Sequence, residues 1–207
     1  NDLEIEFKVD EMSSISTLEV AWEHYPLKYD MWMDEPYMDE PRFCSRVAET
    51  NKLELLKWAR EEKKCEWDSG TIDAAAYQGN LEMVKYCVAK KCPIDAWACA
   101  EAAGNGHLEV LKYLREEAKA PWDSETAAGA AKFGHLHILE YLVERKYDQY
   151  SEWACMDAAK FGHLDCLQYL HETAKAPWDS RAVRYAHMFN QTHCVQYLLD
   201  NNCPYQK

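Results

Sequence analysis

Three histidines recur at equal intervals and are the first candidates for chemistry in this chain. His107, His135 and His163 stand 28 residues apart, each where a helix is predicted to begin. Imidazole nitrogens serve as metal ligands and as general bases. Equivalent positions on stacked helices, however, lie about 8–10 Å apart, whereas zinc needs its ligand nitrogens at about 2 Å. We therefore expect these histidines to hold the turn between helices, with no metal bound.

No other grouping of residues is typical of an active site. The sequence has no nucleophile–base pair, no paired carboxylates in a plausible cleft, no glycine-rich phosphate loop and no EF-hand pattern. Most of the seven glycines fall where turns between helices are expected. The chain is therefore not expected to be an enzyme, and no cofactor is predicted.

Bulky residues recur once in each predicted linking loop. A position that is always large favours packing between successive units over a row of ligand-stacking rings. The residues of this position are Trp67, Ile94, Trp122, Tyr150, Trp178 and Tyr205.

Other positions vary from unit to unit, which is not expected of a shared core position. One contains Trp97 and Trp153, and the corresponding residues elsewhere are Gly70, Glu125 and Arg181. Two more positions vary similarly, through Asp73, Ala100, Ala128, Met156 and Arg184, and through Ala74, Glu101, Gly129, Asp157 and Tyr185. Tryptophan, tyrosine and arginine are the residue types that most often anchor interfaces. The predicted partner-binding residues are Trp97, Trp153, Met156, Arg184 and Tyr185, with Trp22 and Trp32 added from the N-terminal segment. For the residues of the repeats, the alternative is contact with residues 1–42 of the same chain.

A sixfold repeat must position these residues. Its central aromatic falls at steps of 28, 27, 28, 28 and 28 residues, through Trp58, Tyr86, Tyr113, Tyr141, Tyr169 and Tyr197. A repeat of this length indicates a stacked solenoid, because one unit cannot bury its own apolar face whereas neighbours bury each other's.

Residues 122–149 illustrate one unit. Asp123 or Ser124 can cap a helix over 125–132, and Phe133-Gly134 interrupts it. A second helix opens at His135 with leucines at helical spacing. Each unit is therefore predicted to be a helix–turn–helix with a linking loop and no strand.

The units resemble the ankyrin repeat. The similarity lies in the pattern A-A-x-x-G-[HN]-L, as in Ala130-Ala131…Gly134-His135-Leu136, and covers about residues 43–205. The usual ankyrin period is 33 residues, and the missing residues fall in the linking loop, where ankyrins carry a β-hairpin finger. The T-P-L-H opening is also absent. The resemblance thus implies a short variant with Pro-Trp-Asp loops, vestigial fingers and first helices that line a concave face.

Cysteine usage favours a reducing compartment. The chain has nine cysteines, an odd number, and no CxxC pair. Several fall on predicted core faces, where a thiol behaves as a small hydrophobe. We expect neither a disulfide framework nor a zinc site. The expected location is intracellular: the cytoplasm, or an organelle interior if a leader was removed before Asn1.

Charge is unevenly spread. The net charge is −13, of which residues 1–42 carry −9. The basic footprint that usually accompanies nucleic-acid binding is missing, so no nucleic-acid partner is expected. The acidic start could attract a basic partner or be a solvated tail.

Residues 1–42 do not fit the repeat. A short helix is expected over 12–25, capped by Ser13 or Ser14. The stretch 26–41 is too rich in proline for a long helix and too aromatic for an ordinary linker. An extended segment lying on another surface fits best.

The sequence therefore predicts an all-α, ankyrin-like helical-repeat solenoid of about six helix pairs over 43–207, with a non-repeat N-terminal extension over 1–42. The expected function is a protein–protein interaction scaffold or adaptor that binds a partner of unknown identity through its first-helix, concave face. The alternative is a structural subunit of a larger assembly, anchored by the N-terminal arm. No transmembrane segment is predicted, although such an assembly could itself be membrane-associated.

Overall fold

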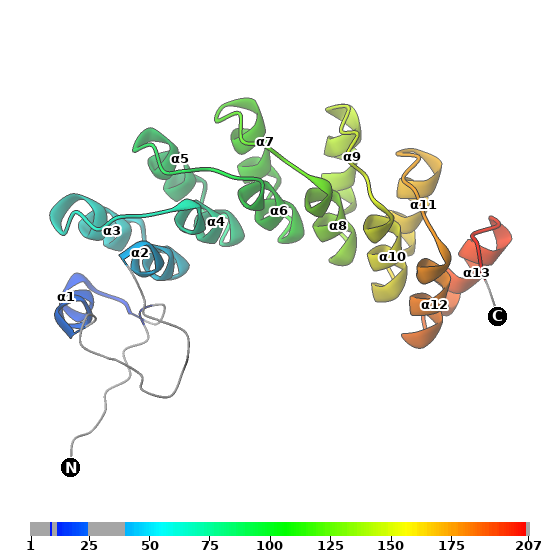
Figure 1. Ribbon diagram of the computed structural model, residues 1–207, viewed down its shortest axis with the longest axis horizontal. Helices are drawn as coiled ribbons and strands as arrows, with labels where there is room; N and C mark the ends of the chain where they lie inside the picture. The colour runs from blue at the N-terminus through cyan, green and yellow to red at the C-terminus, as the bar shows by residue number, and fades with distance from the viewer. Residues whose placement is uncertain (1–8, 10–11, 25–39, 206–207) are drawn as a thin grey trace, which may run out of the picture. The chain divides into compact units, whose positions relative to one another are not determined.

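The computed structural model describes residues 9, 12–24 and 40–205, and within these ranges the protein is entirely helical (Figure 1). The all-α prediction is confirmed, and the linking loops at Trp122 and Trp178 contain no strand. Compactness divides the chain into two units, Asn1–Ile94 and Asp95–Lys207.

Helices alternate between two sets. The first helices of the repeats are α2 (Glu40–Glu49), α4 (Ser69–Tyr77), α6 (Trp97–Gly104), α8 (Ser124–Lys132), α10 (Glu152–Phe161) and α12 (Ser180–Met188). The second helices are α3 (Leu53–Lys57), which continues as a π-helical turn (Trp58–Glu62), α5 (Leu81–Ala89), α7 (Leu108–Glu116), α9 (Leu136–Glu144), α11 (Leu164–Glu172) and α13 (Thr192–Asp200). The array thus begins at Glu40, slightly before the predicted boundary.

Aspartate caps start the first helices. The carboxylates of Asp68, Asp123 and Asp179 each accept a hydrogen bond from the backbone N–H two residues later, at 3.0, 3.1 and 2.8 Å. Such a cap satisfies a helix donor that would otherwise lack a partner. The Trp-Asp pair in the loop therefore sets where each of these helices begins.

Left-handed residues make both turns of the repeat. Between the first and second helices, Gly134 has a φ of 74° and Gly162 a φ of 81°. In the two end units Asn51 and Asn190 adopt the same region, at 60° and 59°, which asparagine tolerates better than most residues. After each second helix the left-handed residue is a lysine or Asn202.

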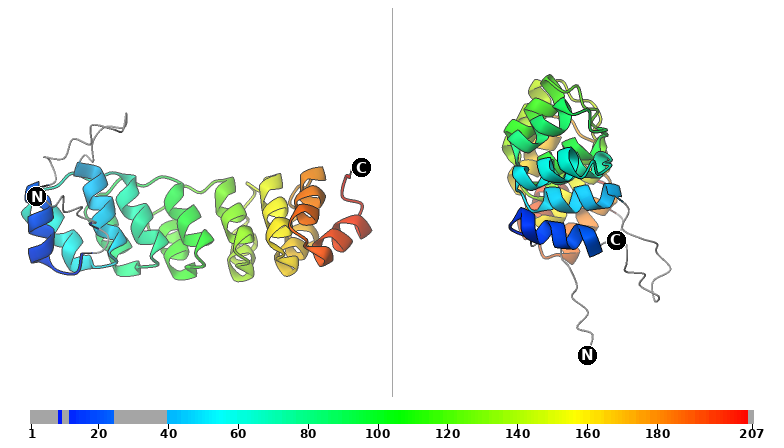
Figure 2. Two further views of the ribbon diagram at one scale, coloured as in Figure 1. Left: turned by 90° about the horizontal axis from the view of Figure 1, so that it is seen from below. Right: turned by 90° about the vertical axis from the view of Figure 1, so that its left-hand side faces the viewer.

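The second unit contains two rows of helices. In Figures 1 and 2, α6, α8, α10 and α12 lie side by side, and α7, α9, α11 and α13 form the other row. Alanines and small residues line the first helices, so the backbones approach closely. A Cβ atom added to Gly129 would lie only 3.3 Å from Cα of Gly104. Between the rows, Leu111, Leu139 and Leu167 are fully buried.

The central aromatic of alternate repeats ties neighbouring second helices together. The hydroxyl of Tyr141 donates to Glu116 at 3.1 Å, and that of Tyr197 donates to Glu172 at 2.9 Å. Tyr86 makes the same bond to Glu61 in the first unit. The repeated aromatic thus combines apolar packing with a directional contact to the preceding repeat.

In the first unit a further helix, α1 (Ile15–His24), packs on the array. The Ser14 hydroxyl accepts from the Thr17 N–H at 3.3 Å, which confirms one of the two predicted caps. Leu18 is fully buried, and the ring of Trp22 lies edge-on to Phe43 of α2 at 4.9 Å. Residues 25–39, and with them the predicted extended segment, lie outside the described residues.

Candidate functional site

Two of the recurring histidines, His135 and His163, hold the turns of the repeat. Nε2 of His135 lies 3.1 Å from the carbonyl oxygen of Gly104, and Nε2 of His163 lies 3.1 Å from that of Lys132. Each ring therefore joins its own turn to the backbone of the preceding repeat. Burial lowers the pKa of His135, which favours the neutral ring. Among the described residues, no group of three potential ligands could hold a metal ion.

Loop tryptophans are covered by cations or rings. The guanidinium of Arg60 lies 4.7 Å from the centre of the Trp67 ring, and that of Arg115 lies 3.9 Å from Trp122. His171 takes the same position and stacks on Trp178 at 3.8 Å. These contacts give the half-buried tryptophans a packing role.

The residue at the stacking position changes together with the loop residue that it contacts. Where the stacking position holds a valine, at Val88 and Val143, the loop residue is Ile94 or Tyr150. Trp67 and Trp178 also meet the central tyrosine of the next second helix edge-on. Packing within and between units therefore accounts for this row of residues.

All nine cysteines lie among the described residues, where they are buried and form no disulfide bond. Burial raises the pKa of Cys155 to about 12 and of Cys194 to about 11. A thiol in this state is a poor nucleophile and a poor metal ligand. The cysteines therefore act as small core hydrophobes.

Exposed apolar surface gathers on the first helices. Apart from Ile15 and Val20 of α1, and Leu199 and Tyr205 near the C-terminus, every exposed large hydrophobic side chain of the described residues lies in a first helix or directly after it. Trp97 and Trp153, both predicted as partner-binding residues, are 56 % and 48 % exposed.

In the second unit these residues form a grid, which we call the first-helix face. Along α10, Trp153, Asp157 and Phe161 follow one another every fourth residue and thus share one side of the helix. The other helices place residues at the same three levels. The face comprises Trp97, Glu101 and Asn105; Glu125, Gly129 and Phe133; Trp153, Asp157 and Phe161; and Arg181, Tyr185 and Phe189.

Arginines surround the exposed rings at one edge of the face. The guanidinium of Arg181 lies 5.0 Å from the centre of the Trp153 ring and is held by Asp179 at 2.8 Å. Arg184, a predicted site residue, is exposed and lies 5.2 Å from the ring of Tyr185, which is half-buried. The structure therefore groups Trp153, Arg184 and Tyr185 on two adjacent helices, α10 and α12.

Met156 corrects one prediction. Its side chain is only 3 % exposed, although Trp153 of the same helix is exposed. The helix α10 packs against α8 on one side and α12 on the other. Ala100 and Ala128, at the same position of earlier repeats, are buried too. In these three repeats the position belongs to the core, whereas Arg184, which holds it in the last repeat, is exposed.

The two N-terminal candidates have different outcomes. Trp22 contacts Phe43 of its own chain, so its ring serves the fold of the first unit. Trp32 lies outside the described residues.

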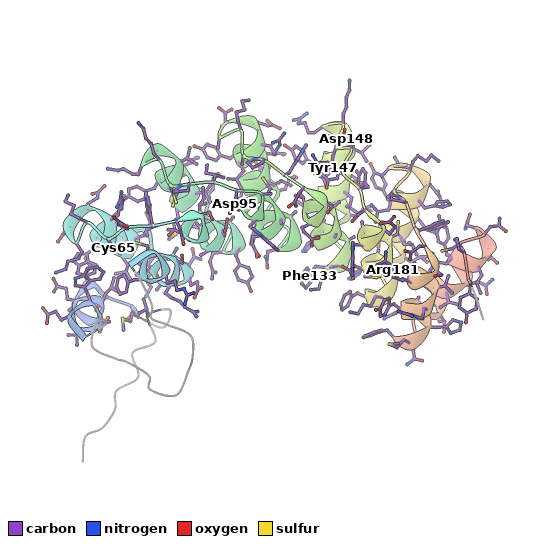
Figure 3. The ribbon with its side chains drawn as sticks, in the orientation of Figure 1. Cys65, Asp95, Phe133, Tyr147, Asp148 and Arg181 are labelled. Atoms are coloured by element: carbon purple, nitrogen blue, oxygen red, sulfur yellow. The ribbon has the colours of Figure 1, made fainter. Side chains whose placement is uncertain are left out.

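Sequence reasoning missed a row of phenylalanines. Phe133, Phe161 and Phe189 close the first helices of three successive repeats and are 54 %, 38 % and 44 % exposed. Figure 3 shows Phe133 at the end of α8. Their common position directly before Gly134, Gly162 and Asn190 was the available signal. At the level of sequence, Phe133-Gly134 indicates only the end of the helix over 125–132.

Two carboxylates lie at the middle level of the face. Burial raises the pKa of Glu101 and that of Asp157 above their ordinary values. For Asp157 the nearby ammonium groups of Lys160 and Lys132 act in the opposite direction. The face thus combines aromatic rings, cations at its edges and partly desolvated acids at its centre.

Comparison with known protein families places both units in context. A family model described as ankyrin repeats (3 copies) matches residues 99–181, and one described as ankyrin repeats (many copies) matches residues 72–115. No curated protein matches the chain. Over the residues that the structure describes, no helix has both the length and the apolar character needed to cross a membrane.

Proposed function

Because the chain belongs to the ankyrin-repeat family, whose repeats are generally protein–protein interaction modules, we propose that it is an adaptor. In this proposal it holds a protein partner against the first-helix face of residues 95–207. The observation that carries the proposal is the segregation of exposed large apolar side chains onto the first helices. Scattered exposed hydrophobics are ordinary, whereas a contiguous set marks an interaction surface.

The composition of the face supports the same function. Trp153, Tyr185 and Arg184 are residue types that dominate interface energetics when a partner removes them from water. The second helices of the same unit differ, since their outer surface carries charged residues such as Glu109, Lys112 and Glu140. A partner that needs apolar contacts therefore has one favoured side.

The arginine stack prepares Trp153 for binding. Arg181 is held between the Asp179 carboxylate and the indole ring, so both side chains are ordered before a partner arrives. Ordering a side chain at an interface costs about 0.5–1.5 kcal/mol. A site that is already ordered avoids much of this cost.

Substitution of exposed face residues tests the proposal. Full-length wild-type protein, Trp153→Ala and Phe161→Ala would each be used to recover partners from native extract, with Glu140→Ala as the control on the outer side of α9. A partner bound in stoichiometric amount by the wild type and the control, and lost with both face variants, is the expected result. Both rings are exposed, so the thermal unfolding midpoint should change little.

The alternative, a structural subunit anchored by its N-terminal arm, predicts a different outcome. Co-purification would then survive Trp153→Ala and Phe161→Ala and would fail when residues 1–39 are removed. Loss of stability shared by the truncation and by Trp153→Ala, without additivity, would place the chain's own arm on the face. Either result would replace the proposed function.

A further inference from the structure

Aromatic rings and ammonium groups alternate along the ends of α8, α10 and α12. Nζ of Lys132 lies 5.0 Å from the centre of the Phe133 ring and 5.9 Å from that of Phe161. Nζ of Lys160 lies 5.0 Å from Phe161 and 5.0 Å from Phe189. Each lysine thus bridges the rings of two neighbouring repeats. We call these five residues the Phe–Lys row.

Cations in this row are held by rings instead of by carboxylates. Within the described part of the chain, no acidic oxygen lies within ion-pair distance of Lys132 or Lys160. A lysine over an aromatic face gains roughly 0.5–1 kcal/mol at an exposed site. Arg184, on the same helix as Phe189, also has no ion pair there. The row therefore presents ordered positive charge between apolar surfaces.

The spacing of the row limits what can lie along it. Packed helices stand about 8–10 Å apart, and an extended chain in the polyproline II conformation advances about 3.1 Å per residue with three residues per turn, so that every third side chain lies on the same side. A segment crossing α8, α10 and α12 therefore advances about three residues per helix. Apolar side chains at every third residue would meet the rings, and the residues between them would face the lysines.

We propose that the partner contacts the Phe–Lys row with an extended acidic segment that carries large apolar side chains at about every third residue. The inference rests on the proposed function and adds the chemistry of the partner. Carboxylates between the apolar residues would pair with Lys132 and Lys160, which are already ordered by their rings. Charge-assisted hydrogen bonds of this kind are about twice as strong as neutral ones.

A single-stranded nucleic acid would also combine anionic groups with stacking surfaces. Two features favour a peptide. A nucleic acid binds by neutralising many successive phosphates, and a chain of net charge −13 offers no continuous basic stretch for them, whereas a few carboxylates need only the lysines of the row. Glu101 and Asp157 occupy the middle level of the same face, where a continuous phosphate backbone would be repelled. A peptide can place its acids over the lysines alone.

Selection from a peptide library tests which side chains the row prefers in a bound segment. Full-length protein would be used to select from a display library of random decapeptides, and the dominant peptide would be synthesised with a fluorescent label for anisotropy titration. The expected selection is rich in Asp and Glu, with aromatic or long aliphatic residues three positions apart. Labelled oligo(dT) of ten nucleotides serves as the nucleic-acid probe and should bind at least about tenfold more weakly.

Matched variants locate the binding. Phe161→Ala and Lys160→Glu should each weaken the selected peptide by about tenfold or more, the loss expected when one anchoring contact is removed. Lys112→Glu makes the same change in net charge on α7 and should alter affinity by less than about twofold. Lys160→Gln, with an unchanged melting curve, covers the case in which the charge reversal disturbs folding.

Contrary outcomes are equally definite. Selection of basic or neutral peptides that still depend on Phe161 would overturn the acidic segment while leaving the proposed function intact. Peptides insensitive to both row variants, no selected peptides at all, or tighter binding of oligo(dT) would also overturn it. Sedimentation would be measured at about 50 µM, a concentration where weak dimers form. A dimer that dissociates in Phe161→Ala would show that a second copy of the chain occupies the row. The proposed function itself has a separate test, described above. It would be contradicted if the native partner still bound after Trp153 was replaced by alanine.

Discussion

Trp122 illustrates how a single ring is held in the linking loop. Arg115 lies 3.9 Å from the ring centre on one face, and Tyr147 approaches edge-on at 5.1 Å. Truncating a core aromatic typically lowers the free energy of unfolding by about 3–5 kcal/mol. Because the indole of Trp122 is only half-buried, this range is an upper limit here. We expect Trp122→Ala to lower the free energy of unfolding by about 2 kcal/mol, measured by denaturant titration.

A double-mutant cycle would separate the stack from the rest of the packing. Arg115→Ala alone removes the cation, and the pair Arg115→Ala with Trp122→Ala removes both partners. The coupling energy should be about 0.5–1 kcal/mol. Strict additivity would mean that the guanidinium contributes nothing through the ring.

Glu101 provides a prediction on pH. Burial raises its pKa in the folded protein, so the folded state disfavours the charged form. The resulting penalty is complete above the folded pKa and disappears as the pH falls below the ordinary value of about 4.3. Glu101→Gln should therefore raise the melting temperature at pH 7 and leave it nearly unchanged near pH 3. Glu140→Gln, at an exposed position on α9, is the control. An equal gain at both pH values would contradict desolvation as the cause.

At the scale of elements, the turn between first and second helices couples neighbouring repeats. Gly134 has a φ of 74°, and a Cβ atom there would lie 2.6 Å from Nδ1 of His163. A residue other than glycine in this region costs about 1–2 kcal/mol before any clash is counted. Gly134→Ala should lower the free energy of unfolding by about 2 kcal/mol or more.

The clash can be tested apart from the backbone strain. In a His163→Ala background the imidazole ring is absent. Gly134→Ala should then lower the free energy of unfolding only by the strain of a left-handed backbone at alanine, about 1–2 kcal/mol. The measurement is denaturant unfolding of the four proteins of the cycle. An unchanged cost in the absence of the ring would show that the histidine gives way freely.

Helices and turns were predictable from sequence because their signals are local. Asp123 caps α8, Gly134 ends it, and leucines at helical spacing mark α9; each acts within a few residues. The period of 28 residues then determined how the units stack. Family models confirm the relation that this pattern suggested.

The candidate site was only partly predictable, because exposure depends on packing between helices. Trp153 was identified from variation between repeats, and its ring is exposed. Met156 met the same criterion and is buried, since a varying position at the edge of a core can hold side chains of different size. Phe133 belongs to a row that is large in three successive repeats and nevertheless exposed, whereas Trp122 belongs to a row that is large in every repeat and is itself half-buried. Sequence spacing alone does not separate these two rows.

At the scale of the molecule, the free energy of unfolding should be a sum of contributions from the single repeats and from the contacts between neighbouring repeats. Each repeat of a solenoid contacts only the next ones, so its unfolding propagates from unit to unit. In the second unit α9 packs against α8 and α11. Contacts such as the one from Tyr141 to Glu116 extend this coupling by one repeat at a time.

Leu139→Ala tests this propagation. Leu139 is fully buried in α9, and removing such a side chain typically costs about 2–5 kcal/mol. Because the loss passes through neighbours, amide hydrogen exchange should accelerate most in α9, then in α8 and α11, and least in α13. Leu199→Ala, at an exposed position of α13, should change exchange little beyond its own helix. If Leu139→Ala instead accelerated every helix of residues 95–207 by the same factor, the unit would unfold as one block, and the sum over neighbours would not describe it.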